Sequence, residues 1–318
     1  MDNKPSFESK SLILAQQICD CLEVPNALAD SSHPCSKVVR IQNAMVADDE
    51  SMRQRPEPWI GDIQNSRVLF LSSNPGISDS SDLDSRESFP TYKDSAVESA
   101  EFFTRRFDQT NIPILATFNH PTEPNFLVHC NDGKYRSGMK NEKRPQATWQ
   151  GIHDLATSIL GSECDPNSDY ALTEIVHCKS KMAEGVEEAS SMCVDVWLTK
   201  ILAVATAPVI VVIGSKARDY FAISQLGFRA DFGSDKNKVY KDLSQRERAT
   251  RDIQISDFGG VRRLYIYSFH PTHAISPKKF KDMFGLEVLT WLSKVANQEA
   301  EMPKTKTELD ALIMGLTN

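Results

Sequence analysis

The sequence has no apolar stretch of about 18 residues, the length needed for a membrane-spanning helix, and it opens with a polar segment, MDNKPSFESKS. We therefore expect neither a membrane span nor a secretory signal, and a cytoplasmic location. The chain also lacks an excess of positive charge, because 36 Lys and Arg stand against 43 Asp and Glu, for a net charge of −7. An overall basic field that holds nucleic acid without specificity is thereby excluded, and any DNA contact must be local.

Cysteine is scarce and odd in number. Seven cysteines in a chain expected in the cytoplasm favour buried, reactive or metal-bound thiols over a disulfide framework. The hydrophobic share of 40%, with 14 Gly and 16 Pro, is ordinary for a folded domain and excludes the disordered and fibrous classes. A length of 318 residues allows one large domain or two modest ones.

Continuous apolar runs that stop at turn residues are typical of strands buried on both faces, and four occur, at residues 67–71, 170–176, 208–214 and 263–269. Apolar residues at helical spacing lie around them, at 7–23, 95–107, 149–160, 192–205 and 279–295. This alternation predicts an α/β fold, a three-layer α/β/α sandwich with a central four-stranded, mostly parallel sheet.

Three regions follow along the chain. We expect an N-terminal helical extension over residues 1–60, an α/β domain over 61–298, and a C-terminal helix over 299–318. The segment at about 77–150 is far longer than a strand-helix-strand connection needs, so we expect it to form an insertion near the pocket.

Polar residues follow each predicted strand. In a doubly wound sheet, ligands bind outside the carboxyl ends of the strands. These ends are followed by Asn74, Glu174, His177, Gly214 and His270. Each alone is more typical of a turn residue or of a structural histidine, but together they mark the candidate active site.

The ordered set resembles the uracil-DNA glycosylase superfamily. Residues 72–76 (SSNPG) are similar to its first motif, in the Asn-Pro-Gly form of the mismatch-specific branch. Residues 173–179 (TEIVHCK) are similar to the Thr-Asn-x-Val-x-Cys-Arg/Lys stretch of the iron-sulfur families 4 and 5, and residues 270–272 (HPT) stand for their His-Pro-Ser. The resemblance spans about residues 35–295.

The resemblance implies a monofunctional DNA glycosylase, which hydrolyses the N-glycosidic bond of a flipped pyrimidine and leaves an abasic site. It implies that Asn74 positions the water, that His270 donates to the pyrimidine O2, and that Ser73 lies beside the base. No lysine nucleophile is evident, which favours simple hydrolysis over a Schiff-base lyase.

Further side chains are candidates for contacts with the base and the DNA. A flipped base needs an apolar face, and Phe89, with Tyr92 as the alternative, is predicted to stack on it. Ile275 is the predicted wedge into the duplex. The complete set of predicted DNA contacts is Gly214, Ser215, Lys216, Ile275 and Lys278. A plain tight turn at 214–216 and a solvated helix start at Lys278 are the alternatives.

Glu174 stands where the uracil-reading families have Asn. An Asn amide both donates to O4 and accepts from N3–H of uracil, whereas an ionised Glu only accepts. A carboxylate instead suits the exocyclic amino group of cytosine. Together with the long insertion, this favours a cytosine carrying a bulky modification, as in the DNA of some bacterial viruses, and hence a role in antiviral defence. Alternatively, Glu174 turns outward or pairs with Lys179 or Lys181.

Two other functions remain open from the sequence. One is ordinary uracil repair, and the other is a non-catalytic DNA-binding relative. DNA is the expected partner in all three cases, with a monomer as the default.

A cofactor is not needed for the chemistry. Families 4 and 5 nevertheless hold a structural 4Fe-4S cluster through four cysteines, and Cys35, Cys178 and Cys193 match three of the ligands. The families' close N-terminal pair is missing, because Cys19 and Cys21 are spaced too tightly for two ligands from one helix face.

This leaves Cys130 or His33 as the fourth cluster ligand. The alternative is that the matching cysteines are ordinary buried thiols.

Overall fold

The computed structural model describes residues 10–46, 49–77, 89–107, 128–129, 135–136, 147–221, 227–233, 242–258, 260–271 and 278–317. Its strands are β1 (Trp59–Ile60), β2 (Val68–Ser72), β3 (Val128–His129), β4 (Tyr135–Arg136), β5 (Tyr170–Glu174), β6 (Val209–Ile213), β7 (Ile253–Phe258) and β8 (Val261–Ser268). The helices of the first half are α1 (Lys10–Cys19), α2 (Glu23–Ala29), α3 (Ser36–Arg40), α4 (Asn43–Val46), η1 (Glu50–Met52), α5 (Ala96–Thr104) and α6 (Ala147–Leu160). Those of the second half are α7 (Val186–Cys193), the π-helical η3 (Val194–Leu198), α8 (Thr199–Val204), α9 (Gly214–Tyr220), α11 (Gln245–Asp252), α12 (Lys278–Phe284), α13 (Leu286–Ala296) and α14 (Lys306–Leu316).

The main sheet has six strands in the order β1-β5-β2-β6-β8-β7. Its four inner strands, β5, β2, β6 and β8, run parallel to one another. The two edge strands, β1 and β7, are antiparallel to their neighbours. The α/β class is therefore confirmed, whereas the predicted four-stranded sheet is wrong, since the sheet is mixed and two strands larger.

The inner strands are those that the apolar runs predicted. All of β5 and β6 is buried, as are the first four residues of β2, because helices cover both faces of a parallel sheet. The edge strands gave weaker signals. β1 is two residues long, and β7 has a half-exposed second half with no continuous apolar run.

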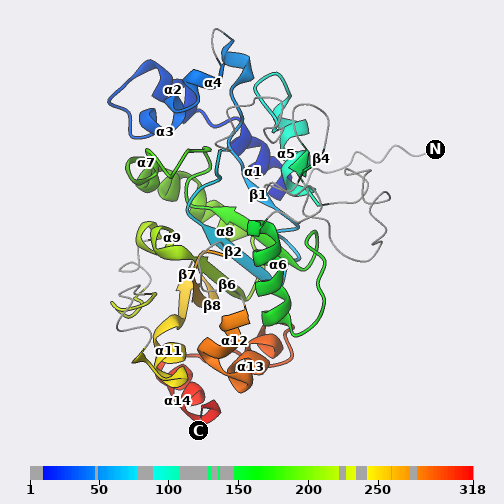
Figure 1. Cartoon of the computed structure of the whole chain (residues 1–318), viewed down its shortest axis with the longest axis vertical. Coiled ribbons are helices and arrows are strands. Elements are labelled where there is room, and N and C mark those ends of the chain that lie inside the picture. Colours follow the sequence, from blue (N-terminus) through cyan, green and yellow to red (C-terminus); the bar gives the residue numbers. More distant parts are fainter. Residues whose placement is uncertain are drawn as a thin grey trace, which may run out of the picture.

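Helices flank the strands on both sides (Figure 1). In this view α7 and α9 lie to one side of the strands, and α6 and α13 lie to the other. One hydrophobic core runs through the described chain and includes Leu14 and Ile18 of α1 as well as Ile313 of α14. The expected N-terminal extension and C-terminal helix thus share their buried surface with the α/β region.

Two predicted helices differ in detail. The helix expected over 279–295 is two helices, α12 and α13, separated at Gly285, whose φ of +81° ends the first one. The helix expected over 192–205 belongs to a longer helical stretch, α7 through α8. Across the described residues, we find no helix with the length and apolarity to cross a membrane.

α6 packs against the turn that follows β8. A Cβ built on Gly151 would lie 2.4 Å from Cβ of Pro271, closer than real side-chain carbons approach. Only glycine therefore lets the helix lie against this turn, which also carries His270.

Gly151→Ala tests this contact. Overpacking costs about 1 to 3 kcal/mol, and an approach of 2.4 Å to Pro271 places the cost in the upper part of this range. Since Ala gains only roughly 1 kcal/mol over Gly in a helix, the free energy of unfolding should fall. Urea denaturation measures the change. Asp154→Ala, at an exposed position of the same helix, should leave stability unchanged or slightly raised. Equal stability of both variants would contradict the close packing of α6 on the turn.

Candidate functional site

The carboxyl ends of the inner strands meet at one edge of the sheet. Ser72 at the end of β2 is opposite Glu174 at the end of β5, and Ile213 of β6 is opposite Ser268 of β8. The segments that follow these strands therefore leave the sheet together. The structure brings the backbones of the four predicted strand-end segments to this edge, which we call the strand-end edge.

The Asn74 side chain is held by a loop beyond β5. Its Nδ2 donates to the carbonyl oxygen of Pro75 at 2.9 Å and to Oγ of Ser180 at 3.1 Å, while its Oδ1 accepts from Oγ of Ser73 at 3.2 Å. The two loops also pair through their backbones, because Ser180 N donates to Pro75 O at 3.0 Å. Sequence reasoning missed Ser180, since nothing local indicates that these loops pair.

His270 is exposed at the same edge. It stands beside the end of β6, because a Cβ built on Gly214 would lie 3.9 Å from Cβ of His270. Gly214 has a φ of +78°, a conformation that favours glycine, and it opens α9 together with Ser215 and Lys216. Ile275 lies outside the described residues, and of Lys278 only the backbone, at the start of α12, is described.

Glu174 points into a buried cluster of charges. It is 5% exposed, and the cluster also contains Glu57 at 2%, Lys179 at 1% and Arg106 at 6%. Burial, and then the negative charge of Glu57, raise the pKa of Glu174 well above its usual value, against the lowering influence of Lys179 and Arg106. The prediction of a cytosine-type base takes Glu174 as ionised, whereas this environment favours the neutral carboxyl.

Lys179 is the ion-pair partner of Glu57. Its Nζ lies 2.6 Å from Oε2 of Glu57, and no ion pair of Glu174 is seen within the described residues. Burial lowers the pKa of Lys179, whereas the Glu57 carboxylate acts to raise it. The alternative in which Lys179 neutralises Glu174 directly is therefore wrong.

Phe89 belongs to the same cluster. Its ring centre lies 3.3 Å from Nζ of Lys179 and 4.9 Å from Cζ of Arg106, and Phe103 stacks on it at 6.4 Å. The ring predicted to stack on a base is thus next to the carboxylates, with cations against it. Tyr92, the alternative, lies under the guanidinium of Arg55 at 4.4 Å.

His177 turns away from this cluster while remaining tied to Glu57. Its Nδ1 lies 2.7 Å from the carbonyl oxygen of Glu57, and because a carbonyl only accepts, Nδ1 carries the proton. Glu57 N donates in return to His177 O at 2.9 Å. Burial lowers the pKa of His177 to about 4, so the ring is neutral near neutral pH, and its buried Nε2 has no partner among the described residues.

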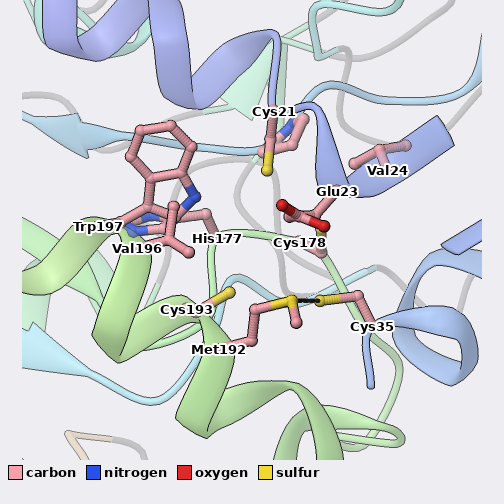
Figure 2. Close-up of a pocket in the computed structure, with 11 residues that line it drawn as sticks. Cys21, Glu23, Val24, Cys35, His177, Cys178, Met192, Cys193, Val196 and Trp197 are labelled. Carbon is pink, nitrogen blue, oxygen red and sulfur yellow. Dashed lines mark hydrogen bonds between the residues drawn. The ribbon is translucent and has the colours of Figure 1, made fainter. Parts of the chain in front are cut away.

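Four cysteines line a cavity beside His177 and the segment that follows β5 (Figure 2). They are Cys21, from the turn between α1 and α2, Cys35, just before α3, Cys178, after β5, and Cys193, the last residue of α7. The cavity is small, about 10 Å³ for the centre of a water-sized molecule. The sulfur atoms of Cys21, Cys35 and Cys193 are turned toward the space between the chain segments.

The rest of the cavity wall is mostly apolar. It is made by Val24, Pro56, Met192, Val196 and Trp197, with Glu23 and His177 as the polar members. Cys35 Sγ lies 3.8 Å from Sδ of Met192. A hydrogen bond shared with Cys193 lowers the pKa of Cys35 and raises that of Cys193, so Cys35 ionises first.

The cavity settles which cysteines meet. Cys35, Cys178 and Cys193 come together as predicted, and the fourth member is Cys21, which the sequence reasoning had set aside. His33 does not line the cavity, because its Nε2 bonds Glu23 at 3.0 Å and its Nδ1 accepts from Cys35 N at 3.1 Å. Cys130 lies outside the described residues.

The error about Cys21 has a simple cause. The prediction places Cys19 and Cys21 on one helix, but α1 ends at Cys19, so Cys21 lies in the following turn and lines the cavity. All six cysteines in the described part of the chain are free, and no group of three or more His, Cys, Asp or Glu side chains there could hold a metal ion.

Comparisons with known proteins add no assignment. No model of a known protein family matches the chain, and no curated protein is significantly similar to it.

Proposed function

We propose that the protein is a monofunctional DNA glycosylase that hydrolyses the N-glycosidic bond of a flipped pyrimidine and leaves an abasic site. The observation that carries this proposal is that the backbone segments with Asn74, Glu174 and His270 meet at the strand-end edge. This edge is where doubly wound sheets bind ligands.

The reaction requires few groups from the protein. A water oxygen bonds to the sugar C1′ as the bond from C1′ to the base nitrogen breaks, the base leaves with the bonding electrons, and the water proton passes to it. Asn74 orients the water through its side-chain oxygen, while Ser180 and Pro75 fix its amide. His270 donates a hydrogen bond to the pyrimidine O2, where negative charge develops.

Hydrolysis is favoured over a lyase reaction. Lys179, whose charge acts on Glu174, is 1% exposed, and its ammonium group is bonded to Glu57. Such a lysine offers no lone pair to attack C1′. Single-stranded and double-stranded DNA are both compatible with this chemistry, and Lys216, at the exposed start of α9, is a candidate for the phosphate contact.

A modified cytosine is the base that we favour. Whether ionised or neutral, the Glu174 carboxyl can accept a hydrogen bond from the exocyclic amino group of cytosine. The long segment between β2 and β5 supplies Phe89 and Arg106 to the same cluster, where Arg106 lies over the Phe89 ring at 4.9 Å. A bulky modification of the cytosine, as in some viral DNA, would give the activity a defensive role.

One observation also favours ordinary uracil repair. The raised pKa of Glu174 increases the share of its neutral form, which presents one donor and one acceptor. This is the set that an Asn amide offers to O4 and N3–H of uracil. Uracil is therefore the second candidate substrate.

We also propose that Cys21, Cys35, Cys178 and Cys193 hold a 4Fe-4S cluster with a structural role. Support comes from four cysteines around one largely apolar cavity, from the lowered pKa of Cys35, and from the lack of a disulfide among the described residues. Burial raises the pKa of Cys21 and Cys178, and the hydrogen bond shared with Cys35 raises that of Cys193. The four thiols do not form a metal-holding group as they stand, so a bound cluster would have to draw them together. When bound, the cluster would fasten the N-terminal helices to the segment after β5. No step of the glycosylase reaction passes through it.

His270→Ala tests the proposed chemistry. The turnover rate of the variant should fall about 100- to 1000-fold, because removal of one hydrogen-bond donor to a developing anion typically slows a reaction by this factor. DNA binding should change far less. Single-turnover assays on duplexes with uracil or a modified cytosine, scored by alkali-sensitive cleavage, measure the rate. Asn74→Ala should behave in the same way, and Lys93→Ala, at an exposed position, serves as the control. Equal losses in binding and turnover would remove His270 from the reaction.

The cysteine cavity has an independent test. Protein purified without oxygen should be brown and contain about four iron atoms per chain. Cys21→Ala, Cys35→Ala, Cys178→Ala and Cys193→Ala should each lower the iron content and the visible absorption, whereas Cys19→Ala and Cys164→Ala, outside the cavity, should keep both. Folded wild-type protein without iron, or full iron in Cys21→Ala, would contradict the assignment.

A further inference from the structure

The buried cluster contains two acidic residues, Glu57 and Glu174, and two basic residues, Lys179 and Arg106. Only one of the two acidic residues, Glu57, has an ion-pair partner among the described residues. Glu57 and Lys179 are in direct contact at 2.6 Å, and both are almost fully buried. Glu174 has no ion-pair partner among the described residues, and its carboxyl accepts a hydrogen bond from Ser72. Arg106 acts on both carboxylates through its charge.

This pairing is imposed by the chain. Two hydrogen bonds to His177 hold the Glu57 backbone in place. Glu57 N–H donates to the His177 carbonyl oxygen at 2.9 Å, and the Glu57 carbonyl oxygen accepts from Nδ1 of the His177 ring at 2.7 Å. Lys179 is two residues beyond His177, and Phe89 packs on its ammonium group at 3.3 Å. The Lys179 ammonium group is therefore directed at Glu57. The carboxylates of Glu57 and Glu174 repel each other in this buried environment of low polarity.

We propose that Glu57, which does not touch the base, sets the charge of Glu174 and thereby determines which pyrimidine the site accepts. Glu57 is a positioning residue that acts through Lys179 and through its own negative charge. This inference rests on the proposed function, because it assigns to Glu174 the reading of the base.

The consequence for the base follows from hydrogen-bonding capacity. An ionised Glu174 only accepts, so it suits the amino group of cytosine and opposes the uracil O4. A neutral Glu174 also donates, so it serves uracil as well. The ratio of uracil to cytosine-type excision should therefore fall as rising pH ionises Glu174.

Two substitutions should move this ionisation in opposite directions. Glu57→Gln removes a negative neighbour and frees Lys179, so Glu174 should ionise about 1 to 3 pH units lower. Lys179→Met removes a positive neighbour, so Glu174 should ionise at higher pH. A purely structural effect would move both variants in the same direction. Glu57→Gln also keeps the backbone bonds to His177, which do not involve the side chain.

The first experiment uses no DNA. Infrared spectra of protein labelled with ¹³C-glutamate, with Glu174→Gln as the reference, follow the carbonyl band of a neutral Glu174 as a function of pH. We expect this band in wild type near neutral pH and its loss at lower pH in Glu57→Gln. Its absence from wild type near neutral pH, or an unchanged midpoint in Glu57→Gln, would overturn the proposal. Glu50→Gln, on the surface, should leave the midpoint unchanged.

The second experiment measures excision of uracil and of a modified cytosine across the same pH range. In Glu57→Gln the ratio of uracil to cytosine-type excision should fall at a lower pH, in step with the infrared midpoint. A shifted midpoint with an unshifted ratio would overturn the role of Glu57 in selecting the base. A shifted midpoint without excision of any base would instead reject the glycosylase function. If Lys179→Met does not fold, Lys179→Arg, which keeps the charge, should retain the wild-type midpoint.

Discussion

The charge environment of Glu174 depends on the buried ion pair between Glu57 and Lys179. Each side chain is almost fully buried, so either charge alone would cost several kcal/mol, and the contact at 2.6 Å offsets this desolvation. The pair also joins two segments far apart in sequence. The Glu57 backbone also bonds to His177. These bonds fix the segment from Glu174 to Ser180, which connects the strand-end edge with the cysteine cavity.

The N-terminal segment, up to Glu57, contributes residues both to the cysteine cavity and to the surroundings of Glu174. Cys21 and Cys35 line the cavity from one side, while Cys178 and Cys193 line it from the other. Glu57 stands at the end of this N-terminal segment and contributes its charge to the environment of Glu174. A group bound by the four cysteines would hold Lys179 in place, because Lys179 is next to Cys178 in the chain. Such a group would thus support the pocket without entering the reaction.

Much of the architecture could be predicted because the signals were local. The apolar runs that became β2, β5, β6 and β8 are buried on both faces, and such strands need no partner to be recognised. β1 was missed because two residues carry no periodicity. The roles of Glu57, Ser180 and Cys21 depend on contacts between segments distant in sequence, which composition and spacing do not reveal. The raised pKa of Glu174 is of the same kind, since it depends on burial and on the charges of Glu57, Lys179 and Arg106.

The central claim is that the strand-end edge releases a pyrimidine base from DNA. The most direct measurement is mass spectrometry of the small molecules freed when protein purified without oxygen is incubated with genomic DNAs that contain ordinary, uracil-substituted or bulky modified cytosine bases. We expect a free modified base from the DNA that contains bulky modified cytosine, with abasic sites in equal amount and an unbroken sugar-phosphate backbone. Binding of these DNAs without release of any base would contradict the account and would identify a non-catalytic DNA-binding protein.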